Sequence, residues 1–101
     1  MSAYKFTYGQ KIRFASEKRP YTIRACDERF AICTKPFNLK KTVLYTIVDL
    51  KKNVRGTENL LFCPGYETDL NCRKALERLQ NEDSHITAKN FIKLDILSLS
   101  K

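Results

Sequence analysis

Basic and aromatic side chains alternate along the first half of the chain, and this pattern carries the clearest chemistry in the sequence. Lysine and arginine neutralise phosphate groups, while an exposed aromatic ring can stack on any nucleobase. Most aromatic residues of this half lie in strand-like segments, where we expect them to be buried. Among the rings outside such segments, Tyr8, Phe37 and Tyr66 are the candidates for exposure.

Positive charge is concentrated in the same half. The chain has 19 Lys and Arg against 11 Asp and Glu, a net charge of +8. Residues 1–57 contain 13 basic and 4 acidic groups, whereas residues 58–101 contain 6 and 7. This balance is typical of proteins that bind nucleic acid or another polyanion, although a basic surface that only maintains solubility gives the same count.

We predict a nucleic-acid-binding surface built from eight basic residues of this half. Arg13 and Arg24 would line a sheet between two phosphate-binding edges. The residues of these edges are Lys35, Lys40 and Lys41 on one side and Lys51, Lys52 and Arg55 on the other.

Catalytic groups are sparse. Asp49 and Lys51 have the spacing of half a metal-dependent nuclease site, in which carboxylates hold a divalent ion and a lysine stabilises developing charge. No second acidic residue can be placed beside them from the sequence. The single histidine, His85, lies in a polar segment without a partner motif, and the three glycines are isolated, so no phosphate-binding loop is present. We therefore predict a non-enzymatic protein without cofactor or metal, with a nuclease as a minor alternative.

Four cysteines raise the question of a zinc site or a disulfide framework. Six residues separate Cys26 from Cys33 and eight separate Cys63 from Cys72, so no Cys-x2-Cys pair exists. Reduced cysteines that pack as small hydrophobic residues fit this spacing best. A metal site and a functional or disulfide-forming pair are the alternatives.

The elements that hold the basic residues are predicted from periodicity. Residues 10–14 alternate apolar and basic side chains, as a half-buried strand does. Residues 21–26 and 30–34 repeat the alternation on either side of a short polar turn and predict a β-hairpin. A two-residue turn would pair Ile23 with Ile32 and keep the apolar side chains on one face.

The segments that follow residue 34 predict a loop, two strands and a helix. Residues 35–41 contain a proline among basic residues and predict a loop, and residues 42–50 are rich in β-branched side chains and predict a central strand. A turn follows at residues 51–53, and residues 91–96 alternate as a final strand. Residues 68–81 predict a helix whose apolar stripe is Cys72, Ala75, Leu76 and Leu79.

These elements predict a single α+β domain spanning residues 1–101. We expect a strongly bent antiparallel sheet, an SH3-like barrel, with one helix before the last strand. A flatter antiparallel sheet that carries the helix on one face is the alternative. The longest apolar-rich run, residues 42–48, is far shorter than the roughly 20 residues of a membrane helix, and residues 1–6 lack the apolar region of a signal peptide. We therefore expect a cytoplasmic protein that does not bind membranes.

Two segments support a family resemblance. Residues 33–50, CTKPFNLKKTVLYTIVDL, and residues 54–60, VRGTENL, resemble small proteins of tailed phages and of prophages of enteric bacteria. The likeness extends to the predicted helix and to residues 93–96. It implies a bacterial cytoplasm and an accessory role, with phage or host nucleic acid or a host protein as partner. The family has no established activity, so no site residue is transferred from it.

From these observations we expect an accessory protein that binds nucleic acid through a basic face. The alternative is a module that uses the same face to bind a host protein and to inhibit or modulate it. Both functions are compatible with a homodimer formed through an exposed strand edge.

Overall fold

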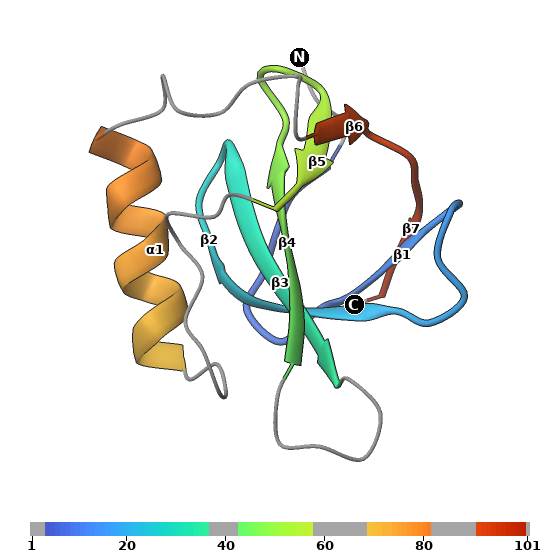
Figure 1. Cartoon of the computed structure of the whole chain (residues 1–101), viewed down its shortest axis with the longest axis horizontal. Coiled ribbons are helices and arrows are strands. Elements are labelled where there is room, and N and C mark those ends of the chain that lie inside the picture. Colours follow the sequence, from blue (N-terminus) through green and yellow to red (C-terminus); the bar gives the residue numbers. More distant parts are fainter. Residues whose placement is uncertain (1–3, 37–42, 58–68, 82–90, 101) are drawn as a thin grey trace.

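A curled antiparallel sheet with one helix on its outer face makes up the fold (Figure 1). The computed structural model describes residues 4–36, 43–57, 69–81 and 91–100. The predicted α+β class and the strong bend of the sheet are confirmed. In chain order the elements are β1 (Lys11–Phe14), β2 (Tyr21–Cys26), β3 (Phe30–Pro36), β4 (Val43–Asp49), β5 (Val54–Gly56), α1 (Asp69–Asn81), β6 (Phe91–Lys93) and β7 (Ile96–Leu99).

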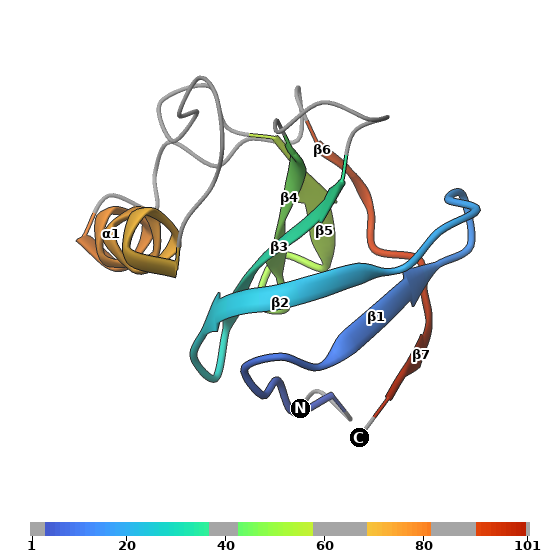
Figure 2. The ribbon, with the colours of Figure 1, turned by 90° about the horizontal axis from the view of Figure 1, so that it is seen from below.

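The two outermost strands of the sheet come from one short C-terminal segment. The strand order is β6-β5-β4-β3-β2-β1-β7, and every pair is antiparallel. Figure 2 shows how the strands curl, so that the residues after β6 can reach β1 and continue as β7. The bend at Leu94 and Asp95 therefore joins the two ends of the sheet.

This bend corrects the predicted final strand at residues 91–96. That stretch is not continuous, because β6 ends at Lys93 and β7 begins at Ile96. The backbone N–H of Leu94 donates to the carbonyl of Asn53 at 2.9 Å, which extends the contact with the β5 side by one residue before the chain bends toward β7. The predicted alternation is also wrong at its start, since Phe91 is buried and Ile92 is exposed.

Apolar side chains form two clusters, one on each face of the sheet. The concave inner face holds Ile12, Phe14, Tyr21, Ile23, Ala31, Cys33 and Val48. The alternation predicted for residues 10–14 is confirmed, since Lys11 and Arg13 are exposed between the buried residues. The outer cluster, between the sheet and α1, consists of Ala25, Phe30, Ile32, Tyr45, Ile47, Cys72, Ala75, Leu76, Leu79 and Phe91.

The β2–β3 hairpin is present, but its predicted register is wrong. Ile23 pairs with Cys33 rather than with Ile32, and Ile32 pairs with Ala25. The prediction assumed one apolar face, yet residues 30–34 of β3 are all buried because α1 covers the outer face. Alternation cannot determine the register of a strand that is buried on both faces.

Asp27 determines where the hairpin turns. Its backbone N–H donates to the Phe30 carbonyl at 2.9 Å, and its carboxylate accepts the N–H groups of Arg29 and Phe30 at 2.7 and 2.6 Å. Burial by itself would raise the pKa of Asp27, but hydrogen bonds from Gln80 and from the two backbone groups lower it below its usual range. The ionised carboxylate thus fixes the turn and also holds α1 through Gln80.

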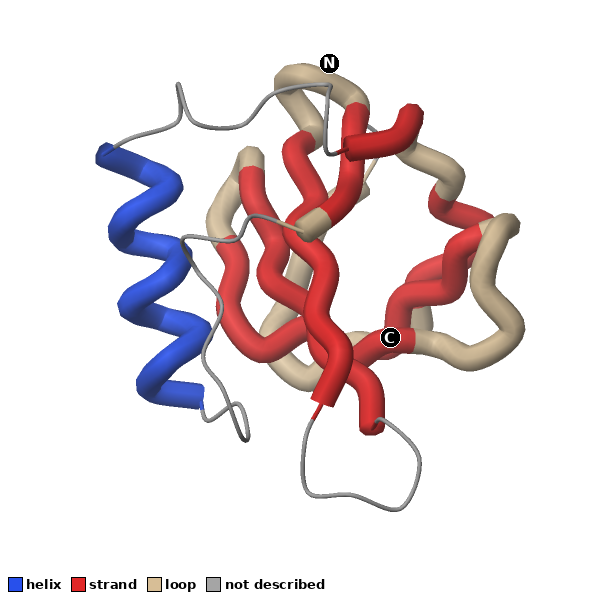
Figure 3. Tube along the Cα trace, in the orientation of Figure 1, coloured by secondary structure: helices blue, strands red, loops and turns tan. Residues whose placement is uncertain are grey.

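The helix lies where its apolar stripe predicts. The four residues of the predicted stripe are buried against β2 and β3, and α1 lies on one side of the sheet (Figure 3). The observed span, Asp69–Asn81, agrees with the prediction to within one residue. No helix in the part of the chain that the structure describes is long and apolar enough to cross a bilayer.

Candidate functional site

Arg55 does not belong to an exposed phosphate-binding edge, which corrects the prediction. It is 5% exposed and lies over the Phe14 ring, with its guanidinium carbon 4.0 Å from the ring centroid. Its Nε donates to Asp95 at 2.6 Å and an Nη group donates to the Ser16 hydroxyl. The guanidinium therefore stabilises the fold: it ties β5 to β1 and to the bend before β7.

Asp95 completes this network. Its Oδ2 accepts both the backbone N–H and the hydroxyl of Ser16, at 2.9 and 2.7 Å, and its carbonyl accepts the N–H of Ala15 at 2.8 Å. Burial by itself would raise the pKa of Asp95, but hydrogen bonds from Arg55 and Ser16 lower it to about 2. We call Arg55, Asp95 and Ser16 the closing network, because these side chains hold the two ends of the sheet together.

Of the remaining lysines of the predicted edges, Lys35, Lys51 and Lys52 lie within the described residues and do not form one surface. Lys35 lies on the face of β3 opposite Thr34; its Nζ is 3.6 Å from the Glu17 carboxylate and 4.7 Å from the Tyr21 ring centroid. Lys51 and Lys52 are exposed on the turn between β4 and β5. Lys40 and Lys41 lie outside the described residues, as do Phe37, Tyr66, Cys63 and His85.

The hydrogen bonds and the ion pair that the Asp49 carboxylate makes within the fold conflict with the nuclease hypothesis. Its side chain is fully buried, and Arg29 binds both of its oxygens, at 2.8 and 2.9 Å. The backbone N–H groups of Lys51 and Lys52 donate to the same Oδ1 at 2.9 and 3.2 Å. The carboxylate thus caps a turn and does not face a substrate. Within the described residues, no group of three or more His, Cys, Asp and Glu side chains is placed to hold a metal.

A row of polar side chains crosses the outer face of β1, β2 and β3. Lys11 is the sheet partner of Thr22 and donates its Nζ to the Thr22 hydroxyl at 2.7 Å. Thr22 is in turn the partner of Thr34, whose hydroxyl accepts the Nε of Arg24 at 3.3 Å. Arg13 lies two residues after Lys11 and so shares its face. The predicted Arg13 and Arg24 therefore lie on the same face of the sheet.

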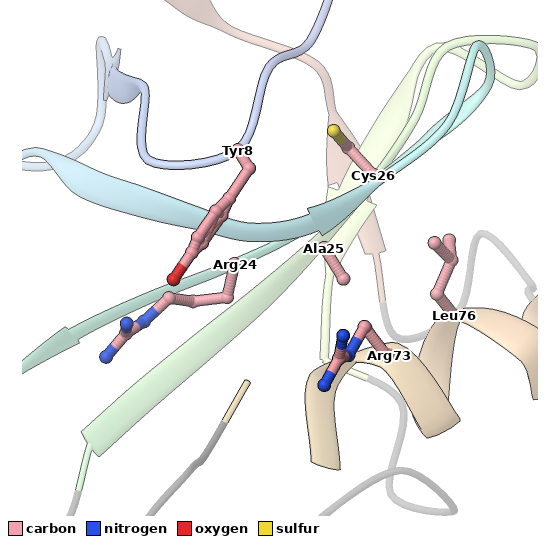
Figure 4. A pocket seen from close by; sticks show the side chains of 6 residues that line it. All are labelled: Tyr8, Arg24, Ala25, Cys26, Arg73 and Leu76. Atoms are coloured by element: carbon pink, nitrogen blue, oxygen red, sulfur yellow. The ribbon is translucent and has the colours of Figure 1, made fainter. Parts of the chain in front are cut away.

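A groove lies beside this row, between β2 and α1 (Figure 4). The sheet register shifts between Ile23 and Ala25, so Arg24 is the extra residue of a β-bulge. Bulges commonly redirect a side chain next to a binding site. The groove has a volume of about 430 Å³ and is lined by Tyr8, Arg24, Ala25, Cys26, Arg73 and Leu76.

The walls of the groove differ in chemistry. Figure 4 shows Tyr8 on one side and Arg73 and Leu76 of α1 on the other, with Ala25 between them. Tyr8 is 53% exposed, as the sequence predicts for its ring. We call this groove together with Lys11 and Arg13 the basic outer face.

Cys26 borders the groove, while its side chain packs against the inner cluster. Burial, and then the nearby Asp27 charge, raise the pKa of the Cys26 thiol above its ordinary value, so the thiol is protonated at neutral pH. Cys26, Cys33 and Cys72 are all free, and the last two are buried. For Cys33 and Cys72, the predicted packing role is confirmed by their burial in the inner and outer clusters.

Two cationic members of the basic outer face, Lys11 and Arg73, were not among the predicted binding residues. Lys11 belongs to the alternating pattern of residues 10–14, and its pairing with Thr22 in the fold places it on the same sheet face as Arg24. Arg73 lies in the half of the chain that has a net negative charge, so the charge distribution does not identify it as a binding residue. Only the packing of α1 against β2 brings it to the groove.

No protein-family model, no curated protein and no solved structure matches the chain. The function is therefore inferred from the residues and their arrangement alone.

Proposed function

We propose that the protein binds nucleic acid through the basic outer face. The observation that carries this proposal is the placement of Arg24, Arg73 and the exposed Tyr8 ring around one groove, with Lys11 and Arg13 on the same face of the sheet as Arg24. Cations neutralise successive phosphates, and a ring on the same surface offers a base a stacking partner.

The fold supports this proposal because it supplies a rigid support for the cations. Arg24 is held by Thr34 and Lys11 by Thr22, so both cations project from paired strands. Binding groups on sheet strands lose less conformational freedom than groups on loops. We also propose that the curled sheet is an SH3-like barrel, since the C-terminal segment pairs with both of its ends. An accessory role in a phage or prophage remains a prediction of the sequence resemblance.

The test is a titration of short labelled single-stranded DNA, duplex DNA and RNA, followed by fluorescence anisotropy at several salt concentrations. We expect saturable binding whose logarithm falls linearly with the logarithm of salt concentration. The variant Arg13→Gln/Arg24→Gln/Arg73→Gln removes three cations of the basic outer face. It should lower affinity by more than about tenfold and reduce the salt slope for single strands by about 2, since each phosphate contributes about 0.7.

A matched control separates this surface from general attraction to a basic protein. The variant Lys51→Gln/Lys52→Gln/Lys93→Gln also removes three positive charges, from exposed residues on the β4–β5 turn and on β6. It should change affinity by less than about threefold at moderate salt, because these lysines do not line the groove and salt screens the attraction of distant exposed charges. Equal losses in the two variants would show that the basic outer face has no special role, and absence of binding at low salt would refute the proposal.

A second function, binding of a host protein, is favoured by different residues. Ile92 on β6 and Leu97 on β7 are 51% and 63% exposed, and large exposed apolar side chains are common in protein interfaces. This function predicts one stoichiometric partner from a host lysate that is lost in an Ile92→Lys/Leu97→Lys variant. Retention of the partner by that variant would exclude these residues from the interface.

A further inference from the structure

We infer that the groove between β2 and α1 is a subsite for one unpaired nucleobase and its phosphate, so that the protein prefers single-stranded over duplex nucleic acid. This inference rests on the proposed function and makes it more specific. It depends on three features of the groove: a fixed ring, cations beside it and an apolar floor.

The Tyr8 ring is held by a tight turn rather than by a free segment. The Gln10 N–H donates to the Thr7 carbonyl at 3.1 Å, and the Gln10 side chain accepts the Thr7 N–H at the same distance. Gly9 has φ +82°, the value that the third position of such a turn requires. The ends of the turn are bonded to β2, through Gly9 and Gln10 to the backbone of Ile23, at 2.8 and 2.9 Å. The backbone that carries the Tyr8 ring therefore needs little ordering when a base stacks on the ring.

Cations lie on both sides of the space that a base would enter. Arg24 comes from the sheet, where Thr34 orients its Nε, and Arg73 comes from the exposed side of α1. Arginine binds phosphate oxygens through a planar fork of donors and also stacks on aromatic planes. A nucleotide bound beside Tyr8 therefore meets a positive group on either side.

The floor of the groove is apolar and uncharged, so it suits a nucleobase rather than a charged group. Ala25 and Leu76 are apolar and belong to the outer cluster, and the neighbouring Cys26 thiol is uncharged. A volume of about 430 Å³ lies within the range of small-ligand sites, about 300–1,000 Å³. Because a base in a duplex is stacked on its neighbours, only an unpaired base can present its face to Tyr8.

The experiment compares labelled (dT)12 with a twelve-unit abasic strand of the same charge, using wild type and Tyr8→Leu. Stacking contributes about 1–3 kcal/mol per base. We therefore expect wild type to bind (dT)12 about tenfold more tightly than the abasic strand, and Tyr8→Leu to lose most of this preference. The affinity of Tyr8→Leu for the abasic strand should stay within about twofold of the wild-type affinity. Tyr8→Phe keeps the ring and should behave as wild type within about twofold.

Tyr4→Leu is the matched control, because Tyr4 lies in the same N-terminal segment and is also exposed. Its hydroxyl donates to the carbonyl of Ile96 on β7 at 3.5 Å, on the other side of β1 from β2 and the groove. It should bind both strands as wild type does. Equal affinity of wild type for the two strands, or an equal loss on both strands in Tyr8→Leu, would overturn the subsite while leaving phosphate binding intact. No binding of either strand would overturn the proposed function with it.

Discussion

Removing the Asp95 charge should destabilise the protein in a strongly pH-dependent way. Asp95→Asn keeps the shape of the side chain but deprives Arg55 of its ionised partner. The carboxylate has a folded-state pKa of about 2 against an ordinary value of 3.8. Each pKa unit corresponds to about 1.4 kcal/mol, and the side chain is 21% exposed, so we expect ionisation to contribute about 2 kcal/mol of stability at neutral pH.

The sign of the pH dependence follows from the lowered pKa. A carboxylate with a depressed pKa stabilises the fold above its unfolded-state pKa and loses that contribution as pH falls through its folded-state pKa. The gap in unfolding free energy between wild type and Asp95→Asn should therefore be about 2 kcal/mol from pH 7 to pH 4, about 1 at pH 3 and under about 0.5 at pH 2.

Urea denaturation of the two proteins between pH 7 and pH 2, followed by circular dichroism, measures this gap. Glu77→Gln removes an exposed carboxylate on α1 and should change stability by less than about 0.5 kcal/mol. A gap that stays constant from pH 5 to pH 2 would refute the electrostatic reasoning, because it would then come from altered packing. A gap near zero at pH 7 would show that the ion pair between Arg55 and Asp95 does not stabilise the fold.

Three further predictions concern other parts of the fold. Asp49→Asn should destabilise the protein by about 2–4 kcal/mol in urea denaturation, since it leaves Arg29 beside a neutral group; a loss below about 0.5 kcal/mol would contradict the role of this ion pair. Gly9→Ala should cost about 1 kcal/mol because of its positive φ alone, since no atom lies within 4 Å of the added Cβ; an unchanged melting temperature would argue against the turn. Burial raises the pKa of the Cys33 thiol, so mass spectrometry at pH 8 should find it unlabelled by iodoacetamide until urea unfolds the protein, and rapid labelling of the native state would contradict its burial.

Element positions could be predicted well from the sequence where one face of an element is buried. β1 alternates Ile12 and Phe14 with exposed basic residues, and α1 presents a single apolar stripe. In both cases hydrophobic periodicity reports which side faces the core. The hairpin register could not be predicted this way, since β3 packs against the inner cluster and against α1 at once.

The candidate site shows a second reason why the sequence did not predict every feature: burial of a charged residue cannot be predicted locally. A charged side chain is expected to be exposed, and this holds for Arg13. It does not hold for Arg55, because Asp95, Ser16 and the Phe14 ring bind its guanidinium. Asp95 is 40 residues away in the chain, and nothing local marks the two as partners. Arg73 is the opposite case, since only tertiary packing brings it to the sheet. Tyr8 could be predicted as exposed because it lies beside a glycine, outside any alternating segment.

The pairing of β1 with β7 has a consequence for how the chain folds. Ile12 pairs with Leu99, so almost the whole chain forms the loop that this contact closes. The entropy of closing such a loop must be lost before its contacts contribute, and topologies with many distant contacts fold slowly. We therefore expect the meander from β1 to β5 to form before residues 91–99 dock. Until they do, β1 and β5 each have an unpaired edge to which another chain can add a strand.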